Sequence, residues 1–249
     1  MILHDCEQNT EAWHRLRLGI PTASEFHKII TPKKLEISKQ ASGYMYRLLA
    51  EWVTGEQLPN FSSEWMERGQ DLEDQAVLAY EMLTGAETRR AGFITTDDGL
   101  LGCSPDRLIG DDGDLEIKCP LIQTQIEYAL SGTVGEDYMA QLQGRMLIHG
   151  RKYVDIFSFH PLLSIPAVRV NRDEEFIATL GTVLKGFTEL MLRKRLELEH
   201  RFGPFVRPER EVPVYDEVVS DADVERILTD KPTPKTEEAL RWGSTIDKD

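Results

Sequence analysis

Three charged residues in the middle of the chain have the types and the spacing of a site that cleaves phosphodiesters. Asp106 follows a serine and a proline, and Glu116 and Lys118 lie two positions apart further along, in the pattern D-x9-E-x-K. Carboxylate oxygens are ligands that Mg²⁺ prefers, and a bound divalent ion lowers the pKa of its water and stabilises charge on the phosphate. A nearby lysine can orient or deprotonate that water. These residue types therefore predict metal-dependent hydrolysis.

A β-hairpin is the element that would bring these residues together. Two apolar runs, LLGCSPDRLIG and LEIKCPL, flank the segment DDGD, and an Asp-Gly pair in this position is a hairpin signal. With the turn centred on the first two aspartates of DDGD, Asp106 is expected beside Ile117. Side chains alternate along a strand, so Glu116 and Lys118 should share one face. Two carboxylates held close are costly unless a cation lies between them, which gives this place a reason to bind metal.

A less specific interpretation of the hairpin stays open. Surface hairpins with these residue types are common, and Glu116 and Lys118 could form an exposed ion pair that contributes under ~1 kcal/mol. Leu115, Ile117 and Cys119 alternate with the charged positions, so the charged face is either solvent or a site. The six histidines show no ligand spacing, and no zinc site is expected.

Around the hairpin, apolar periodicity predicts an α/β fold in which a mixed central sheet is flanked by helices. Thr22 and Ser24 are suitable N-caps for a helix that begins near residue 22. Ser62 or Ser63 is a suitable N-cap for a helix at 62–84, and Gly85 should end that helix. Helices are expected at 11–18, from about 22, and at 43–54, 62–84, 136–149 and 173–200, with strands at 91–96 and 152–159 besides the hairpin.

The composition predicts one folded domain at residues 1–203 and an acidic C-terminal tail at 204–249. The tail holds five of the 12 prolines, carries more acidic than basic residues and shows weak apolar periodicity. We expect it to be extended or partly docked, without a second catalytic domain.

Three features bear on the location of the protein. No apolar run reaches 18 residues, so no membrane span is expected. The first residues lack the basic and apolar segments of a secretory signal. Cys6, Cys103 and Cys119 are too few and too scattered for a disulfide framework. We therefore expect a cytoplasmic, reduced protein.

The formal net charge of −14 argues against a general nucleic-acid coat protein, which would have a basic balance or a basic stripe. An acidic protein can still bind DNA where its Lys and Arg residues line a local groove or channel. Such a protein would bind DNA poorly elsewhere, which suits an enzyme that needs a specific entry site.

Several stretches make the chain similar to the lambda-type phage exonuclease family, the phage recombination alkaline exonucleases within the PD-(D/E)xK nucleases. The stretches occur in family order over roughly residues 10–200, and the segment after about residue 203 matches nothing in the family. The resemblance implies a restriction-endonuclease-like core and makes residues 1–203 a nuclease domain. The matching stretches are AWHRLRLGIPTASE, LLAE, RGQDLEDQA, CSPDRL, LEIKCP and YMAQLQ.

The resemblance assigns roles to the hairpin residues. Asp106 and Glu116 resemble the metal-binding carboxylates of the family, and the main-chain carbonyl of Ile117 would complete the metal shell. Lys118 resembles the lysine that activates the attacking water. We expect the metal to be Mg²⁺, as two ions, with Mn²⁺ able to substitute.

Two further residues are drawn into the active site by the resemblance alone. Glu73 falls where the family has an extra acidic residue that assists the metals or the water; otherwise it is an ordinary helix-surface glutamate. Gln141 matches a glutamine that positions the lysine or water. It could instead be a helix-surface amide, and its neighbour Gln143 leaves the choice between the two open.

Arg17, Ser24 and Ser104 match a pocket for the terminal 5′ phosphate of DNA. Arginine offers a planar fork for phosphate oxygens, and a hydroxyl near a helix N-terminus adds to a site that favours anions. Each residue also has a plainer interpretation. Arg17 could pair with Glu11 or Glu25, Ser24 could cap a helix, and Ser104 could satisfy backbone at a strand end.

Met66, next to Trp65, lies where relatives carry an apolar residue that wedges between base pairs. An apolar residue at a helix start is otherwise a core residue.

The resemblance further implies 5′→3′ digestion of linear double-stranded DNA to 5′ mononucleotides, which leaves 3′ single-stranded tails for recombination. It implies binding to double-stranded DNA ends, a ring-shaped homotrimer with DNA in its channel, and a single-strand annealing recombinase as partner in the cytosol of a bacterial host. Two alternatives are a related PD-(D/E)xK endonuclease and a non-catalytic DNA-end-binding scaffold. The intact Asp106, Glu116 and Lys118 argue against the scaffold.

Overall fold

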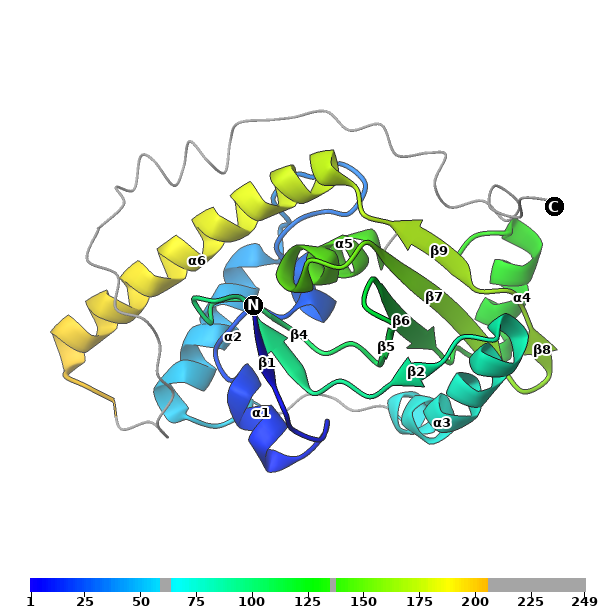
Figure 1. The fold of residues 1–249 in the computed structure, drawn as a ribbon. Coiled ribbons are helices and arrows are strands. Elements are labelled where there is room, and N and C mark those ends of the chain that lie inside the picture. Colours follow the sequence, from blue (N-terminus) through cyan, green and yellow to red (C-terminus); the bar gives the residue numbers. More distant parts are fainter. Residues whose placement is uncertain (59–63, 135–137, 206–249) are drawn as a thin grey trace.

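The computed structural model describes residues 1–58, 64–134 and 138–205, and the side chains described leave out those of 64–71. Helices surround a central sheet, and α6 crosses over α5 on one side of the molecule while α3 and α4 lie at the other end (Figure 1). In chain order the elements are β1 (Ile2–His4), α1 (Glu11–Arg17), the 3-10 helix η1 (Ala23–Lys28), α2 (Ala41–Thr54), α3 (Glu64–Thr84), β2 (Thr88–Arg89), β3 (Phe93–Thr95), β4 (Gly102–Cys103), β5 (Arg107–Ile109), β6 (Gly113–Lys118), α4 (Ile122–Ser131), α5 (Met139–His149), β7 (Tyr153–His160), β8 (Leu163–Ser164), β9 (Val168–Asn171) and α6 (Glu174–Phe202).

The central sheet is mixed, as predicted. Within the described residues its strand order is β2-β5-β6-β7-β8, and β9 pairs with β7. Strands β6 and β7 run parallel, whereas the other pairs in this sheet are antiparallel. A smaller antiparallel sheet joins β1, β3 and β4. The hairpin with the candidate catalytic residues therefore lies in the middle of the larger sheet.

The predicted hairpin forms, but its register differs from the prediction by one residue. Arg107 pairs with Leu115 and Ile109 pairs with Gly113, so the turn is centred on the first aspartate of DDGD and the ladder places no partner for Asp106 at Ile117. The physical reason is Gly113, which joins the strand instead of the turn. A Cβ at Gly113 would lie 2.3 Å from Cζ of Tyr153, so only glycine lets β7 approach this closely.

Most predicted helices are confirmed, with differences at their ends. The side chain of Thr10 caps α1 by accepting a hydrogen bond from the Trp13 N–H. The helix expected from near Thr22 is a 3-10 helix, and Thr22 is its N-cap residue as predicted, although its side chain makes no cap bond. Gly85, with φ of +70°, ends α3 as predicted. Ser62 and Ser63, the expected caps of α3, lie outside the described residues.

Several elements were not predicted: β1, α4 and β9, and the short strands β2 and β8. The four strands are only two to four residues long, so an alternation of apolar residues is too short to mark them in the sequence. The predicted tail at 204–249 lies almost wholly outside the described residues, which end at Phe205. Among the described helices, none is both long and apolar enough to cross a bilayer.

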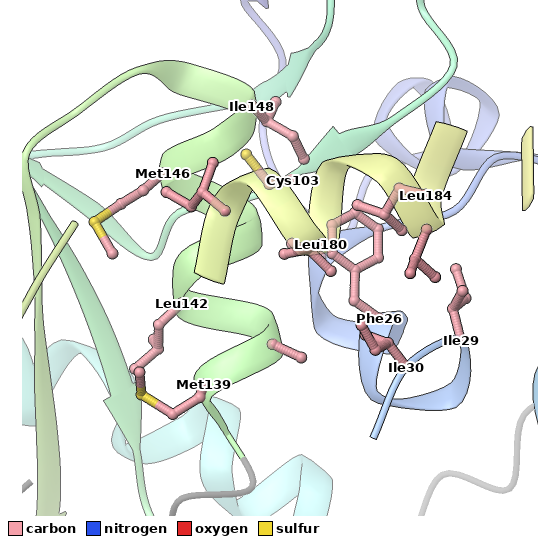
Figure 2. Close-up of a cluster of buried hydrophobic side chains, with 14 of the residues drawn as sticks. Phe26, Ile29, Ile30, Cys103, Met139, Leu142, Met146, Ile148, Leu180 and Leu184 are labelled. Atoms are coloured by element: carbon pink, nitrogen blue, oxygen red, sulfur yellow. The ribbon is translucent and has the colours of Figure 1, made fainter. Parts of the chain in front are cut away.

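The main apolar core lies between η1, α5 and α6. Figure 2 shows Phe26 of η1, and Ile29 and Ile30 just after it, facing Leu180 and Leu184 of α6, with side chains of α5 beside them. Helix α5 approaches η1 so closely that a Cβ at Gly144 would lie 2.4 Å from Cδ2 of Phe26. This packing fixes α5 against one face of the sheet.

The opposite face of the sheet is covered by α3. Leu115, Ile117 and Phe157 on this face pack with Ala76, Val77 and Tyr80 of α3. Because side chains alternate along β6, Asp114 and Glu116 point away from α3 and toward α5.

Candidate active site

Glu116 is the buried centre of the candidate site. It is only 4% exposed, so the charged face of β6 is not open to solvent and the simple exposed ion pair is excluded. The Lys118 ammonium lies 2.6 Å from its Oε1. The Gln141 side-chain amide donates to the same Oε1 at 2.8 Å. Oε2 of Glu116 accepts from the Arg145 guanidinium.

Asp106 lies beside Glu116 although the strand ladder ends before it. Its Oδ2 accepts a hydrogen bond from the Ile117 main-chain N–H at 2.6 Å, so the predicted proximity of these two residues is confirmed by a side-chain contact. Burial raises the pKa of Asp106, and this outweighs the opposing effects of Arg145, the Ile117 N–H and Lys118. The role predicted for the Ile117 carbonyl stays a prediction.

The choice between Gln141 and Gln143 is decided by their contacts. Gln141 reaches Glu116. Gln143 is fully buried, donates to the Asn171 carbonyl at 2.9 Å and accepts from the Asp173 N–H at 3.0 Å. Gln143 therefore joins α5 to the start of α6, and Gln141 is the one of the two that contacts the candidate site.

Lys118 is held between a carboxylate and an aromatic ring. Its side chain is 25% exposed, and Nζ lies 4.6 Å from the ring centroid of Tyr138, which precedes α5. A cation over a tyrosine face is attracted to the ring quadrupole. The ammonium thus has a defined position with an open side.

Glu73 on α3 does not touch Asp106 directly but shares a partner with it. The Arg107 guanidinium donates to Glu73 Oε1 at 2.9 Å and to the Asp106 carbonyl at 2.7 Å. Burial and the Asp106 charge raise the pKa of Glu73, while Arg107 opposes the rise. Glu73 therefore differs from an ordinary helix-surface glutamate, because it pairs with Arg107 and its pKa responds to the Asp106 charge.

A cavity of about 470 Å³ opens beside Asp106 and Glu73. Its lining carries five acidic side chains and two arginines. Its lining residues are Asp5, Cys6, Glu7, Gln8, Asn9, Glu73, Asp74, Arg90, Ala91, Gly92, Asp106 and Arg107.

The groups around Glu116 carry more negative than positive charge. Asp106, Asp114 and Glu116 contribute three carboxylates, whereas Arg145 and Lys118 contribute two cations. In the described part of the chain, no three His, Cys, Asp or Glu side chains gather as a ready metal cage. Two carboxylates with an excess negative charge fit a hard divalent cation that keeps several water or phosphate oxygens, which is how Mg²⁺ binds.

Arg17 and Ser104, predicted to bind a terminal phosphate, are brought together. The Arg17 guanidinium donates to Ser104 Oγ at 3.3 Å and lies 4.0 Å from the Trp13 ring centroid. The indole N–H of Trp13 also donates to Ser104 Oγ, at 2.8 Å. Neither predicted ion pair of Arg17 forms, because Glu11 pairs with Arg15 and Glu25 pairs with Lys28.

The Arg17 guanidinium has no carboxylate within ion-pair distance among the described residues, and burial lowers its pKa. A half-buried cation in this situation gains from an anion. Arg17 also lines a small cavity of about 60 Å³ next to Thr22 and Arg47.

Ser24 and Met66 are the predicted residues that the structure does not join to these sites. The hydroxyl of Ser24 is exposed and lies 3.4 Å from Thr22 Oγ1, with no contact to Arg17 or Ser104 among the described hydrogen bonds. Met66 lies in α3 at a position whose side chain is outside the described residues.

Sequence reasoning missed Arg145, Asp114 and His149. Arg145 contacts both Asp114 and Glu116, and the His149 ring contacts Asp114 at 2.8 Å. Burial lowers the pKa of His149, which keeps the ring neutral. A signal was present, because Gln141, Arg145 and His149 recur every four residues and so share one face of α5.

The mixed sheet, its flanking helices and the hairpin site together define a restriction-endonuclease-like fold. The chain belongs to the YqaJ-like viral recombinase domain family, whose model matches residues 12–152. The resemblance to lambda-type phage exonucleases is thereby confirmed. No curated protein is significantly similar to the chain.

Solved structures agree with this assignment. The chain is similar to the alkaline exonuclease LHK-Exo from Laribacter hongkongensis, at 31% identity and a TM-score of 0.71, over 77% of this chain and 97% of that one. A structure of LHK-Exo in complex with dAMP matches at 31% identity and a TM-score of 0.70, with the same coverage. A phage-related exonuclease from Haemophilus somnus matches at 14% identity and a TM-score of 0.56, over 72% and 96% of the two chains, which shows the fold alone. The family and the LHK-Exo match support a nuclease role.

Proposed function

We propose that the protein is a Mg²⁺-dependent 5′→3′ exonuclease that digests linear double-stranded DNA to 5′ mononucleotides and leaves 3′ single-stranded tails. The observation that carries this proposal is the convergence on buried Glu116 of Lys118 and Gln141, with Asp106 held beside it. The matched alkaline exonuclease, and its complex with a deoxynucleoside monophosphate, support both the reaction and the product class.

Asp106 and Glu116, with the Ile117 carbonyl, are the proposed metal ligands. A bound divalent ion would lower the pKa of the attacking water and stabilise charge on the phosphate. The bound ion would also compensate the buried charge of Asp106. Burial otherwise makes that charge costly and raises the pKa of the carboxyl. Glu73 faces the same cavity as Asp106 and is proposed to bind ordered water there.

Lys118 is proposed to orient the attacking water as an ammonium, and only its neutral amine form would accept the proton of that water. Its ammonium is fixed by Glu116 and Tyr138, yet a quarter of the side chain stays exposed. Gln141 shares Glu116 Oε1 with Lys118, so it sets the position of the oxygen that the lysine contacts.

Polarity is proposed to come from Arg17 and Ser104. Ser104 lies two residues before Asp106, and two extended residues span at most about 7 Å, so an anion bound at Ser104 lies next to the carboxylates. A terminal 5′ phosphate bound there would present the following phosphodiester to Asp106. Ser24 is proposed to join this pocket when DNA binds, and Met66 to separate the base pairs.

Assembly and partner are further parts of the proposal. A homotrimeric ring with a basic lumen and an acidic exterior would reconcile the net charge of −14 with a DNA substrate. A single-strand annealing recombinase would then take up the 3′ tail in the host cytosol. Light scattering after size-exclusion chromatography tests the trimer, and a mass of about one chain would contradict it.

The central experiment uses linear duplexes labelled at either 5′ or 3′ ends, with and without a 5′ phosphate. The expected result is release of 5′ mononucleotides from phosphorylated 5′ ends in Mg²⁺ or Mn²⁺ and no release in EDTA. A closed circular plasmid is the control and should stay intact. Cleavage of the circle would favour a related endonuclease, and end binding without any cleavage would favour a scaffold.

A further inference from the structure

Arg145 is the largest fully buried side chain among the described residues of the fold, with 1% exposure. It lies on the polar face of α5, one turn after Gln141 and one turn before His149. The adjacent face of the helix carries Met139, Leu142 and Met146 in the apolar core (Figure 2). An arginine this deeply buried needs a specific partner for each of its donors.

The guanidinium joins two carboxylates of the same strand. Its Nε donates to Asp114 Oδ2 at 2.8 Å, and its Nη2 donates to Asp114 Oδ1 and to the Leu115 carbonyl, the latter at 3.1 Å. Its Nη1 donates to Glu116 Oε2. Asp114 is completely buried, and its two carboxylate oxygens hold the planar guanidinium of Arg145 in one orientation.

His149 fixes Asp114 from the far side. The Arg151 main-chain N–H donates to His149 Nδ1 at 3.1 Å, which leaves the ring hydrogen on Nε2. That hydrogen is donated to Asp114 Oδ2 at 2.8 Å. The chain of contacts from His149 through Asp114 to Arg145 thus ends on one oxygen of Glu116.

The two oxygens of Glu116 are divided between different tasks. Oε2 is occupied by Arg145, inside the protein. Oε1 is contacted by Lys118 and Gln141, on the side of the candidate site. Without the guanidinium the carboxylate would be held through Oε1 alone, by Lys118 and Gln141, and the two buried carboxylates would lose their shared counter-ion.

We propose that Arg145 is a positioning residue that holds Glu116 through Oε2, so that Oε1 is presented to the divalent ion, with Asp114 and His149 fixing Arg145 in turn. This inference rests on the proposed metal-dependent function. It differs from a purely structural role, in which Arg145 would only fasten α5 to β6 and the metal affinity would not depend on the shape of its side chain.

The test measures Mn²⁺ binding without DNA, by isothermal titration, together with folding by circular dichroism. Arg145→Lys keeps the positive charge but loses the planar guanidinium. Asp114→Asn weakens the contacts that orient this guanidinium and leaves Glu116 unchanged. Both variants are expected to stay folded and to bind Mn²⁺ at least tenfold more weakly than wild type. In activity assays the Mg²⁺ concentration for half-maximal rate should rise, while KM for DNA ends should not change.

Asp155→Asn is the matched control. Asp155 is a buried carboxylate on the neighbouring strand β7, also gripped by an arginine, but it points to the α3 face. The Asp155→Asn substitution should lower the melting temperature without changing the Mn²⁺ affinity. Wild-type Mn²⁺ affinity in both Arg145→Lys and Asp114→Asn would overturn the inference. If wild type itself bound no Mn²⁺, the proposed function would be wrong, and the inference would fall with it.

Discussion

The central sheet carries two clusters in which an arginine pairs with a buried carboxylate, one on each face. The active-site cluster comprises Asp114, Glu116 and Arg145, with Lys118 and Gln141 beside it on the α5 face. The closed cluster comprises Tyr80, Asp155 and Arg169 on the α3 face, and there the numbers of opposite charges are equal.

The closed cluster satisfies itself. Asp155 Oδ1 accepts from Arg169 at 2.8 Å, and Oδ2 accepts from Arg169 at 2.8 Å and from the Tyr80 hydroxyl at 2.7 Å. The active-site cluster, with Asp106 included, instead has three carboxylates for the two cations Arg145 and Lys118. The difference teaches that buried charge alone does not mark a site. Unequal charge next to a cavity is the more informative sign.

The largest expected effect separates the clusters by activity. Lys118→Ala and Glu116→Gln should each lower kcat by about 10²–10⁴-fold, because both remove groups proposed to act on the water or the metal. Asp155→Asn should keep near-normal kcat. Initial rates on a phosphorylated linear duplex measure this, and Lys152→Ala is the lysine control, since Lys152 is exposed and pairs with Asp112, away from Glu116. Normal activity in Lys118→Ala would contradict the assignment.

A second prediction extends the contrast to single arginines. Arg169 has a carboxylate partner, whereas Arg17 has a hydroxyl and no carboxylate among the described residues. Arg17→Ala should raise KM for 5′-phosphorylated ends by about 10–100-fold, the effect of losing a charge-assisted hydrogen bond of about 1.5–3 kcal/mol. Ends without a phosphate should show little change. Arg15→Ala, an exposed neighbour on the same helix, is the control; an equal loss on both kinds of end would count against the pocket.

A third prediction compares two amides on α5. Gln141→Ala should lower kcat about tenfold with little change in melting temperature, because Gln141 contacts Glu116. Gln143→Ala should lower the melting temperature by about 2–4 °C or more, since it leaves a buried N–H and C=O without partners. Its kcat should stay near normal. Paired melting curves and rates decide the matter, and a reversal of the two effects would show that the wrong glutamine was assigned.

The smallest expected effect concerns the stability of the metal-free protein. Burial raises the pKa of Asp106, so the folded state binds its proton more tightly than the unfolded state does. Stability therefore falls as pH rises from the ordinary carboxyl pKa to the raised one. In EDTA at pH 8, Asp106→Asn should melt a few degrees above wild type, and the difference should vanish below the ordinary pKa of aspartate. A lower melting temperature for the variant at pH 8 would contradict this.

The sequence predicted the hairpin and its chemistry because both are local. The D-x9-E-x-K spacing and the Asp-Gly turn lie within a dozen residues, so alternation placed Glu116 and Lys118 on one face. The register was wrong by one residue because Gly113 is needed under the Tyr153 ring, forty positions later in the chain.

The remainder depended on long-range packing that spacing does not encode. The parallel pairing of β6 with β7 requires α4 and α5 between them in sequence, and α4 was not predicted. The burial of Arg145 and Asp114 was not predicted, since nothing local indicates that α5 covers this face of β6. Gln141 was identified only through the family, and its four-residue spacing to Arg145 would have been the physical clue.

The narrow fit of Gly144 against Phe26 has a consequence for how the protein tolerates change. Any side chain at Gly144 would push against Phe26 and tilt α5, and Gln141 and Arg145 would move with the helix. The positions of Gln141 and Arg145 therefore depend on the apolar contact between Gly144 and Phe26, which is itself outside the proposed metal and DNA sites. A random screen for inactive variants should recover Gly144 as readily as Glu116, and directed evolution would have to alter Gly144 and Phe26 together.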